Sequence, residues 1–426
     1  MSVHIGVAQV DITPQAPVWL TGYGDRDHKS EGVYQALRAG AVAISSERED
    51  LVVIAADVIG YGLAYAAEAK ARIGDATGLL PRQIALTATH THCAPFFYPW
   101  CMPGEIEPSY AEFLHGKLVE LVVRALAARV PGQISFARTT SDFGVNRRLP
   151  DGQGGILFAP NPDGPMDRDL DTYIFSDEGG CPLGSLSVFG CHPTSLGGYF
   201  IGGDYPGYFC RAIEAETGAP ALFATGCAGN IRPWYGREEG RFPRPTFPEL
   251  AAAGRELAST ALSSRDNAIP VDATDLQVAD TFHPLPYVEL PTLDELHQAL
   301  QGDEPRRREW AKAMLPLAQN GRLPTSCPHE IQLVRFNADL SAVFLGGEVL
   351  AEIGLHLKAA LQPGLVSTIA YANGLIAYVP GAETYPLGGY EVDGSYHLFV
   401  RPAPFQPTVE DLIVTRTTDL AANFND

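Results

Sequence analysis

The stretch LVVIAADVIGYGLAYAAEAKARIGDATGLLPRQIALTATHTHCAP, residues 51–95, contains an apolar run, an alanine-rich segment and a second apolar run. The two short apolar runs predict strands, and residues 62–76 predict a helix between them. The second predicted strand leads into His90 and His92, two of only 11 histidines in 426 residues. Alternating strands and helices are typical of an α/β fold, and such folds place ligand sites at the ends of strands.

The rest of the chain continues this alternation. Residues 147–168 are rich in Gly, Pro and Asp and therefore predict a loop. We expect one large α/β domain over residues 1–426, with mixed β-sheets flanked by helices and a helical excursion at about 245–325. Further strands are predicted at 4–13, 39–46, 132–139, 172–177, 184–193, 219–230, 329–337, 341–347 and 367–381, and helices at 108–129, 206–217, 245–264, 292–319 (with a break at 302–305) and 349–361.

The charge and composition exclude several classes of function. A formal net charge of −20 argues against binding to nucleic acids or to anionic membranes, because both require a basic surface. No apolar run reaches the ~18 residues of a transmembrane helix, and the start of the chain lacks the features of a secretory signal. The seven cysteines form no Cys-x-x-Cys pair, which favours free thiols in a reducing compartment. We therefore expect a cytoplasmic protein that acts on a small molecule.

The chemistry candidates lie at the ends of predicted strands. Residues two apart on a strand point to the same face, so His90 and His92 should project into one pocket. The pair alone is a weak signal, more often structural than chemical. His192 in SVFGCHPTSLGG and Glu348 in VFLGGEVLAEIG also follow apolar strands, and two His with one Glu match a common ligand set of catalytic zinc. Asp57 ends another strand, where it either orients a ligand histidine or caps a turn.

Several ordered motifs carry a resemblance to a known family. They are GVAQVDITP (6–14), TATHTHCAP (87–95), GVNRR (144–148), FGCHPTS (189–195), ALFATGCAGNIRP (221–233), LGGE (345–348) and AYVPGAETYPLGGYE (377–391). With them the chain resembles the N-terminal catalytic domain of the neutral, non-lysosomal ceramidases. That family has the patterns Ala-Thr-His-Thr-His-x-x-Pro and Tyr-x-x-x-x-Glu-x-Tyr-x-x-x-x-Tyr-Glu. This chain keeps both spacings, the second at Tyr378, Glu383, Tyr385, Tyr390 and Glu391.

The resemblance implies a zinc amidohydrolase in which a zinc-bound water attacks an amide. It places Zn²⁺ on His90, His192, Glu348 and Tyr378. Tyrosine is outside the usual ligand types for zinc, so only the resemblance puts Tyr378 on the metal.

The resemblance also implies catalytic roles beside the metal. His92 matches a catalytic residue that can reach the bound water or the substrate. Arg147 matches an active-site arginine, which can hold an oxyanion, although Arg148 leaves the register open by one residue. Tyr385 and Tyr390 match pocket-lining tyrosines that can donate hydrogen bonds to the tetrahedral intermediate or contact the substrate.

Two departures from the family bear on the substrate. In AGNIRPW, Asn230 and Arg232 replace the Asp and Ser of a ceramidase segment, so a serine nucleophile has no support here. We expect both residues to contact the substrate, and the charge of Arg232 suits an anionic group better than a long acyl chain. The chain ends at Asp426, so we expect no immunoglobulin-like C-terminal domain. A small or N-acyl amide is therefore expected as substrate rather than ceramide itself.

Three alternatives stay open. The same zinc site could cleave an ester, a lactone or a cyclic amide. The fold could also serve a binding protein without catalysis, although retention of all four expected ligands speaks against it. A cysteine next to a site residue could act as nucleophile or ligand, but small buried cysteines are the more common explanation; these are Cys93, Cys191 and Cys227.

Overall fold

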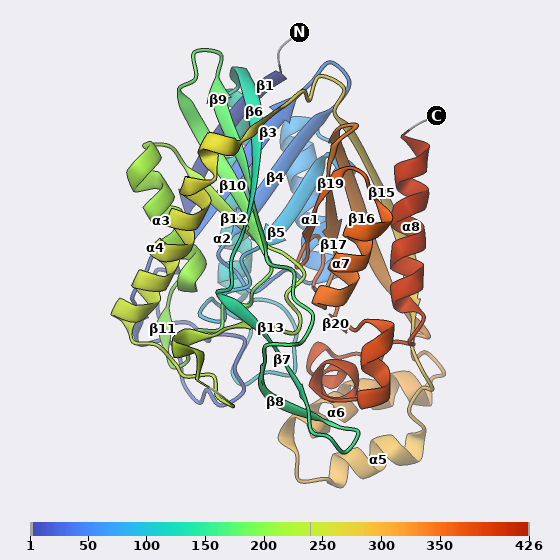
Figure 1. Ribbon diagram of the computed structural model, residues 1–426. Coiled ribbons are helices and arrows are strands. Elements are labelled where there is room, and N and C mark those ends of the chain that lie inside the picture. The colour runs from blue at the N-terminus through green and yellow to red at the C-terminus, as the bar shows by residue number, and fades with distance from the viewer. Residues whose placement is uncertain (1–2, 239, 425–426) are drawn as a thin grey trace.

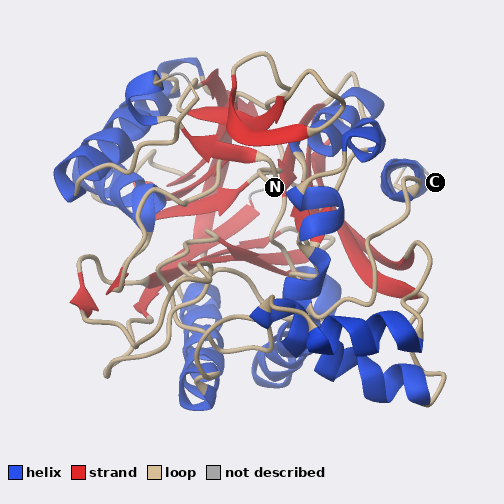
Figure 2. Ribbon diagram, turned by 90° about the horizontal axis from the view of Figure 1, so that it is seen from below, coloured by secondary structure: helices blue, strands red, loops and turns tan. Residues whose placement is uncertain are grey.

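The computed structural model describes residues 3–238 and 240–424. Two large β-sheets face each other in the middle of the molecule, and helices cover the outer face of each sheet (Figure 1). Seen from below, strands occupy the middle and most helices lie at the periphery (Figure 2). The architecture therefore has four layers, helices–sheet–sheet–helices, and it confirms the expected mixed α/β fold.

The larger sheet is mixed. The pairs β4–β5 and β10–β12 are parallel, and the other pairs are antiparallel. Along the sheet the order is β12 (Ala221–Thr225), β10 (Pro182–Phe189), β9 (Asp169–Asp177), β6 (Val130–Thr140), β1 (Val3–Asp11), β3 (Arg38–Ser45), β4 (Asp50–Ala56) and β5 (Ile84–Ala88), with β14 (Ile269–Val271) also paired to β6.

The second large sheet is smaller, and short sheets lie below both. Its order is β15 (Gln277–Pro286), β16 (Ser326–Asn337), β17 (Leu340–Leu345) and β19 (Leu365–Ile369), of which the last pair is parallel. The short sheets are β11 (Phe200–Ile201) with β2 (Gly32–Val33), β13 (Ile231–Pro233) with β7 (Gly144–Pro150) and β8 (Ile156–Asn161), and β18 (Glu348–Val349) with β20 (Tyr378–Val379).

The helices divide between the two outer faces and the lower end. The larger sheet is covered by α2 (Pro108–Ala127), α3 (Asp204–Thr217) and α4 (Phe247–Ser263), with α1 (Leu63–Thr77) against α2. The second sheet is covered by α7 (Ala351–Ala360) and α8 (Val409–Asn423). The helices α5 (Leu293–Gln301) and α6 (Pro305–Gln319) form a hairpin at the lower end (Figure 1). Within the described residues, no helix is long and apolar enough to cross a bilayer.

Strand alternation builds two separate cores. In β3, Ala41 and Ala43 point toward the helices, whereas Val42 and Ile44 point into the space between the sheets. Phe344 of the second sheet joins Val42 and Ile44 in this inner core. Because both faces of these strands are buried, their sequences are nearly continuous apolar runs rather than alternating ones.

The structure corrects three of the expectations about local structure. The predicted loop 147–168 contains the last four residues of β7 and all of β8, and the first five residues of β7 are buried although three are Asn or Arg. The predicted strand 83–92 ends at Ala88, before the histidine pair. The predicted strand 367–381 is interrupted between β19 and β20.

Candidate metal centre and active site

The candidate site lies where several strands end. His90 and His92 follow β5, His192 follows β10, and Glu348 follows β17 after a Gly-Gly pair. These strands belong to both large sheets, and β20, which pairs with the strand that begins at Glu348, lies below the second sheet (Figure 1). Open α/β folds bind ligands at the carboxyl ends of their strands, and this position agrees with that rule.

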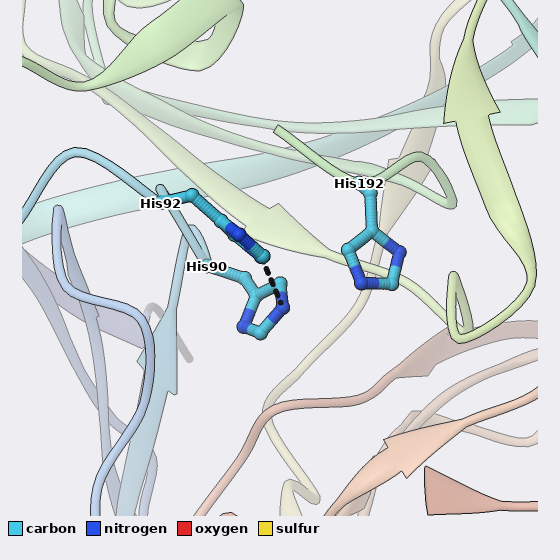
Figure 3. Close-up of side chains that lie close together, drawn as sticks. All are labelled: His90, His92 and His192. Carbon is cyan, nitrogen blue, oxygen red and sulfur yellow. Dashed lines mark hydrogen bonds between the residues drawn. The ribbon is translucent and has the colours of Figure 1, made fainter. Parts of the chain in front are cut away.

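Three imidazoles converge in the buried interior (Figure 3). The Nε2 atoms of His90 and His92 are 3.3 Å apart. Glu348 joins them, because its Oε2 lies 3.0 Å from His192 Nε2 and 3.4 Å from His90 Nε2. His90 and His192 are fully buried, and Glu348 is 3% exposed. The four side chains thus gather their donor atoms around one small space.

Backbone carbonyls orient all three rings. A carbonyl can only accept, so each ring must donate its Nδ1–H and leave the lone pair on Nε2, facing the cluster. The three bonds are from His90 to Ile59 (2.5 Å), from His92 to Gly22 (3.1 Å) and from His192 to Ala228 (2.5 Å).

The histidine pair converges for a reason other than strand alternation. His90 lies beyond β5 with φ of +65°, in the left-handed region that a side chain other than glycine rarely adopts. This turn brings His92 back beside His90. Gly22 gives the ring of His92 its room, because a Cβ there would lie 2.5 Å from the imidazole and the backbone has φ of +96°.

The donor set fits a zinc ion. Nitrogen and oxygen ligands bind zinc at about 2.0–2.1 Å in a tetrahedron, which places any two ligands about 3.3–3.4 Å apart. The cluster's separations of 3.0, 3.3 and 3.4 Å agree with that spacing. His90, His92 and His192 form a group whose ligand atoms all lie within 4.8 Å of one another, and the ring of His90 lies nearer to that of His192 (4.8 Å) than the ring of His92 does (5.9 Å).

The electrostatics keep the donors in the form a metal needs. Burial lowers the pKa of His192 to about 4, so its imidazole is neutral at pH 7. Burial also lowers the pKa of His92, and the neighbouring His90 and His192 add to that effect.

Arg147 and Arg148 share one carboxylate but face different surroundings. Arg147 donates from Nε to Glu391 (2.7 Å), and Arg148 donates from Nη1 to the other oxygen of Glu391 (2.6 Å). Arg148 also donates from Nη2 to the carbonyl of Gly388 (2.7 Å). The Nη2 of Arg147 is buried and has no hydrogen-bond partner among the described residues. Arg147, not Arg148, therefore keeps an unused buried donor among the described residues, and its guanidinium carbon lies 5.4 Å from the ring of Tyr378.

The tyrosines separate into those near the cluster and one that is not. Tyr378 pairs with Glu348 in the register of β18 and β20, and its ring stacks at 6.4 Å on that of His192. Tyr390 lies 5.4 Å from the ring of Tyr378 and is 40% exposed, at the mouth of the site. The hydroxyl of Tyr385 instead donates to the carbonyl of Gln406 (3.0 Å).

The two residues that depart from the family pattern take different positions. The side-chain amide of Asn230 is fully used inside the protein, because Nδ2 donates to Glu352 and Oδ1 accepts from the Ala351 N–H. Asn230 thus links the site strands and offers no free group. Arg232 donates to the hydroxyl and the carbonyl of Thr194 and lies at the rim.

Sequence reasoning missed Tyr371 and Tyr23. The ring of Tyr371 lies 4.1 Å from that of His90, its φ is +55°, and its buried hydroxyl has no partner among the described residues. The only sequence signal is a tyrosine before Ala-Asn-Gly at a strand end. Tyr23 lies 5.0 Å from the ring of His92 and belongs to a loop without any motif.

The remaining nearby groups support the site without joining it. Asp57 accepts hydrogen bonds from the Arg38 N–H and the Thr89 hydroxyl, so it holds the backbone just before His90 rather than a ring. Burial raises the pKa of Cys93 and of Cys227 to about 12, and that of Cys191 well above its usual value. These thiols are therefore protonated at pH 7, which disfavours a cysteine nucleophile.

The fold and the cluster define a class of protein. Buried imidazoles and a carboxylate at strand ends are a donor set that can hold a metal ion. The sequence profile described as neutral/alkaline non-lysosomal ceramidase, N-terminal, matches residues 3–225, more than half of the chain. The chain therefore belongs to this family.

Similar proteins agree with this assignment. The neutral ceramidase of Mycobacterium tuberculosis is 27% identical over 247 residues, which are 53% of this chain and 37% of that protein. The matched region thus spans little more than a third of that relative. The crystal structure of the neutral ceramidase from Pseudomonas aeruginosa has a TM-score of 0.73 at 22% identity and covers 96% of this chain and 75% of its own. A ceramidase complexed with C2 has a TM-score of 0.76 at 21% identity, with coverages of 97% and 74%. At these identities the structural likeness shows a shared fold.

Proposed function

We propose that the protein is a zinc-dependent amidohydrolase that cleaves a small or N-acyl amide with water. The observation that supports this most is the buried cluster of imidazoles and one carboxylate, with the unpartnered Arg147 Nη2 beside it. Membership of the ceramidase family and the neutral ceramidase relative support hydrolysis of an amide. We further propose that residues 1–426 act as one hydrolase domain.

We assign His90, His192, Glu348 and Tyr378 as the residues that hold the ion. A bound zinc supplies a water of pKa near neutral and polarises a carbonyl, which are the two things that amide hydrolysis needs. Glu348 contributes the negative charge of the set, and its buried position makes that charge costly without a cation nearby. Tyr378 is assigned through the family pattern and its register opposite Glu348.

Arg147 stabilises the oxyanion that develops during attack. Its Nε is fixed by Glu391, so the guanidinium plane is held in place before substrate arrives. The free Nη2 then donates to the oxygen, in a site from which water is largely excluded. Tyr390, at the mouth, contacts the substrate. Tyr385 assists only when its hydroxyl leaves the carbonyl of Gln406, and we assign it no step in this conformation.

His92 handles the proton. Its Nδ1–H is held by Gly22, so its Nε2 lone pair faces the cluster and can accept a proton. Protonated His92 then donates to the leaving amine, which cannot depart as an anion. The position of Nε2, 3.3 Å from that of His90, keeps the transfer within one water of the reacting atoms.

A panel of matched amides and esters, assayed with the metal-loaded protein, tests this function. We expect cleavage of N-acyl amides, with loss on chelation and recovery on adding zinc. Cleavage of esters or lactones alone would overturn the amidase assignment. No turnover of any compound by fully loaded protein would favour a binding protein instead.

A further inference from the structure

Three arginines besides Arg147 lie on segments close to the loops around the histidine cluster. Arg232 lies in β13, Arg244 in the loop before α4, and Arg306 in the first turn of α6. They come from separate segments of the chain and converge only in the fold.

Aromatic rings connect these arginines to the cluster. The guanidinium carbon of Arg244 lies 5.4 Å from the ring of Tyr23, and that ring lies 5.0 Å from the ring of His92. Phe158 lies 5.4 Å from the guanidinium carbons of both Arg147 and Arg232. These contacts link Arg232 and Arg244 to the residues beside the candidate metal centre.

Arg306 reaches the same rim from the helical hairpin at the lower end. Burial raises the pKa of the Tyr390 hydroxyl, while the charges of Arg147 and Arg306 act in the opposite direction. Arg306 also packs on Gly24, next to Tyr23. The loop that holds Tyr23 and the start of α6 thus meet at the mouth.

Two of these guanidinium groups pack directly against glycines, where a side chain would clash with them. A Cβ on Gly24 would lie 1.5 Å from Nη2 of Arg306, and a Cβ on Gly197 would lie 1.7 Å from Nη1 of Arg244. Gly197 follows His192 by five residues and Gly24 follows Tyr23, so both glycines belong to loops that border the site. Any side chain at either glycine would displace the guanidinium.

Among the described residues, the arginines at the rim have no acidic partners. Across the described ranges, no Asp or Glu oxygen forms an ion pair with Arg232, Arg244 or Arg306. Arg232 donates instead to Thr194 and stacks on Phe158 and Phe242. The chain has 50 acidic residues and a net charge of −20, yet within the described part of the chain these three arginines form no ion pair with any of them.

We propose that the substrate carries an oxyanion, a carboxylate or a phosphate, which Arg232, Arg244 and Arg306 bind at the mouth while its amide lies at the metal centre. This inference names the substrate class of the proposed amidohydrolase and rests on that function. The planar guanidinium suits both anions, because its two parallel N–H groups match two oxygens of either. Phe158 and Phe242 provide apolar contact for the carbon chain between the anion and the amide.

The burial of Arg232 favours a bound anion at this rim. It lowers the pKa of Arg232, and the charges of Arg147 and Arg244 lower it further, against the opposing effect of Tyr23. A bound oxyanion compensates these positive charges. The positive charges of these arginines repel one another, and each of them attracts an anionic substrate.

Matched substrates test the charge preference directly. N-hexanoylglycine and N-hexanoylethanolamine share the acyl chain and the amide and differ in carboxylate against hydroxymethyl, and N-hexanoyl-O-phosphoethanolamine adds the phosphate. We expect kcat/KM to be at least about tenfold higher for one of the anions than for the neutral amide. The better anion identifies the source of the charge. Equal or faster cleavage of the neutral amide would overturn the proposal.

Variants locate the preference. Arg244→Gln changes an exposed side chain and should reduce the preference about tenfold, and Arg232→Gln should act in the same direction. Arg322→Gln, an exposed arginine beyond the opposite end of α6 from Arg306, is the matched control and should leave the preference unchanged. A preference that survives both rim variants would overturn the proposal.

Binding of uncleavable analogues separates this proposal from the proposed function. Sulfonamide analogues of the glycine, ethanolamine and phosphoethanolamine compounds are measured by calorimetry on the metal-loaded protein. If no amide is cleaved, the amidohydrolase fails, but tighter binding of an anionic analogue that Arg244→Gln abolishes still supports the anion site. Equal affinities for the charged and neutral analogues would overturn the anion site even if amides are cleaved.

Discussion

Replacing Arg147 with lysine keeps a positive charge beside Glu391 but removes the buried Nη2 donor of the guanidinium. The Nε of Arg147 lies 2.7 Å from Glu391, and one lysine ammonium can replace that contact. It cannot also occupy the position of Nη2, which has no partner among the described residues. Loss of one oxyanion donor costs about 2.7–4 kcal/mol of transition-state stabilisation, which is about 10²–10³ in kcat.

The matched control is Arg148→Lys. Arg148 binds the same carboxylate, but its Nη2 donates to Gly388, so it supports the fold rather than the reaction. We expect its kcat to change by less than about tenfold, while both variants lose stability, because each disturbs a buried ion pair. The assay is kcat on an N-acyl amide, with metal content and the free energy of unfolding measured on the same samples. Equal losses of kcat in the two variants, or loss of metal in Arg147→Lys, would refute the reasoning.

Three other predictions follow from the site and its surroundings. His90→Ala should lose the metal, whereas His92→Ala should keep it and lower kcat; elemental analysis checks this, and metal loss in His92→Ala would exchange the two roles. Burial raises the pKa of Asp57 from 3.8 to about 6, so the folded protein holds a proton that the unfolded chain releases as the pH rises between these values. Between pH 4 and pH 8, the free energy of unfolding of the wild type should therefore fall by up to about 3 kcal/mol relative to that of Asp57→Asn. Urea titration of both proteins measures this, and a difference between them that does not change with pH would contradict the prediction. Thiol alkylation at pH 7 should modify the exposed Cys181 and spare activity, because burial raises the pKa of Cys93 to about 12; mass spectrometry with an activity assay checks this, and inactivation that follows modification of Cys93 would contradict it.

Local sequence patterns predicted helices with one buried face and strands that are buried on both faces. The predicted helix 108–129 closely matches α2, and the predicted strand 39–46 matches β3. The hairpin of β7 and β8 was wrongly predicted as a loop, because Arg147 and Arg148 are buried in β7 by Glu391, more than 240 residues away. Nothing near these arginines in the sequence signals that contact.

The candidate site was also predicted only in part from the sequence. Strand-end logic identified His192 and Glu348, which the structure brings to within 3.0 Å of each other. It identified His90 and His92 as neighbours, although a left-handed turn and not a strand makes them so. Tyr371, which packs against His90, had no spacing to reveal it, since its position depends on the contact between the two sheets.

The rim arginines depend even more on tertiary structure. Arg232 was identified because it replaces a family serine, but Arg244 and Arg306 belong to a loop and a helix without motifs. Gly24 and Gly197 leave room for the guanidinium groups of Arg306 and Arg244, and this role is visible only in the folded structure.

The central claim is that a metal ion held by the histidine–glutamate cluster is required for hydrolysis. Elemental analysis of the purified protein, combined with turnover of an N-acyl amide before and after chelation, tests it most directly. We predict close to one zinc per chain, loss of activity when it is removed, and recovery when zinc is added back. A metal-free protein that keeps its full activity would contradict the account.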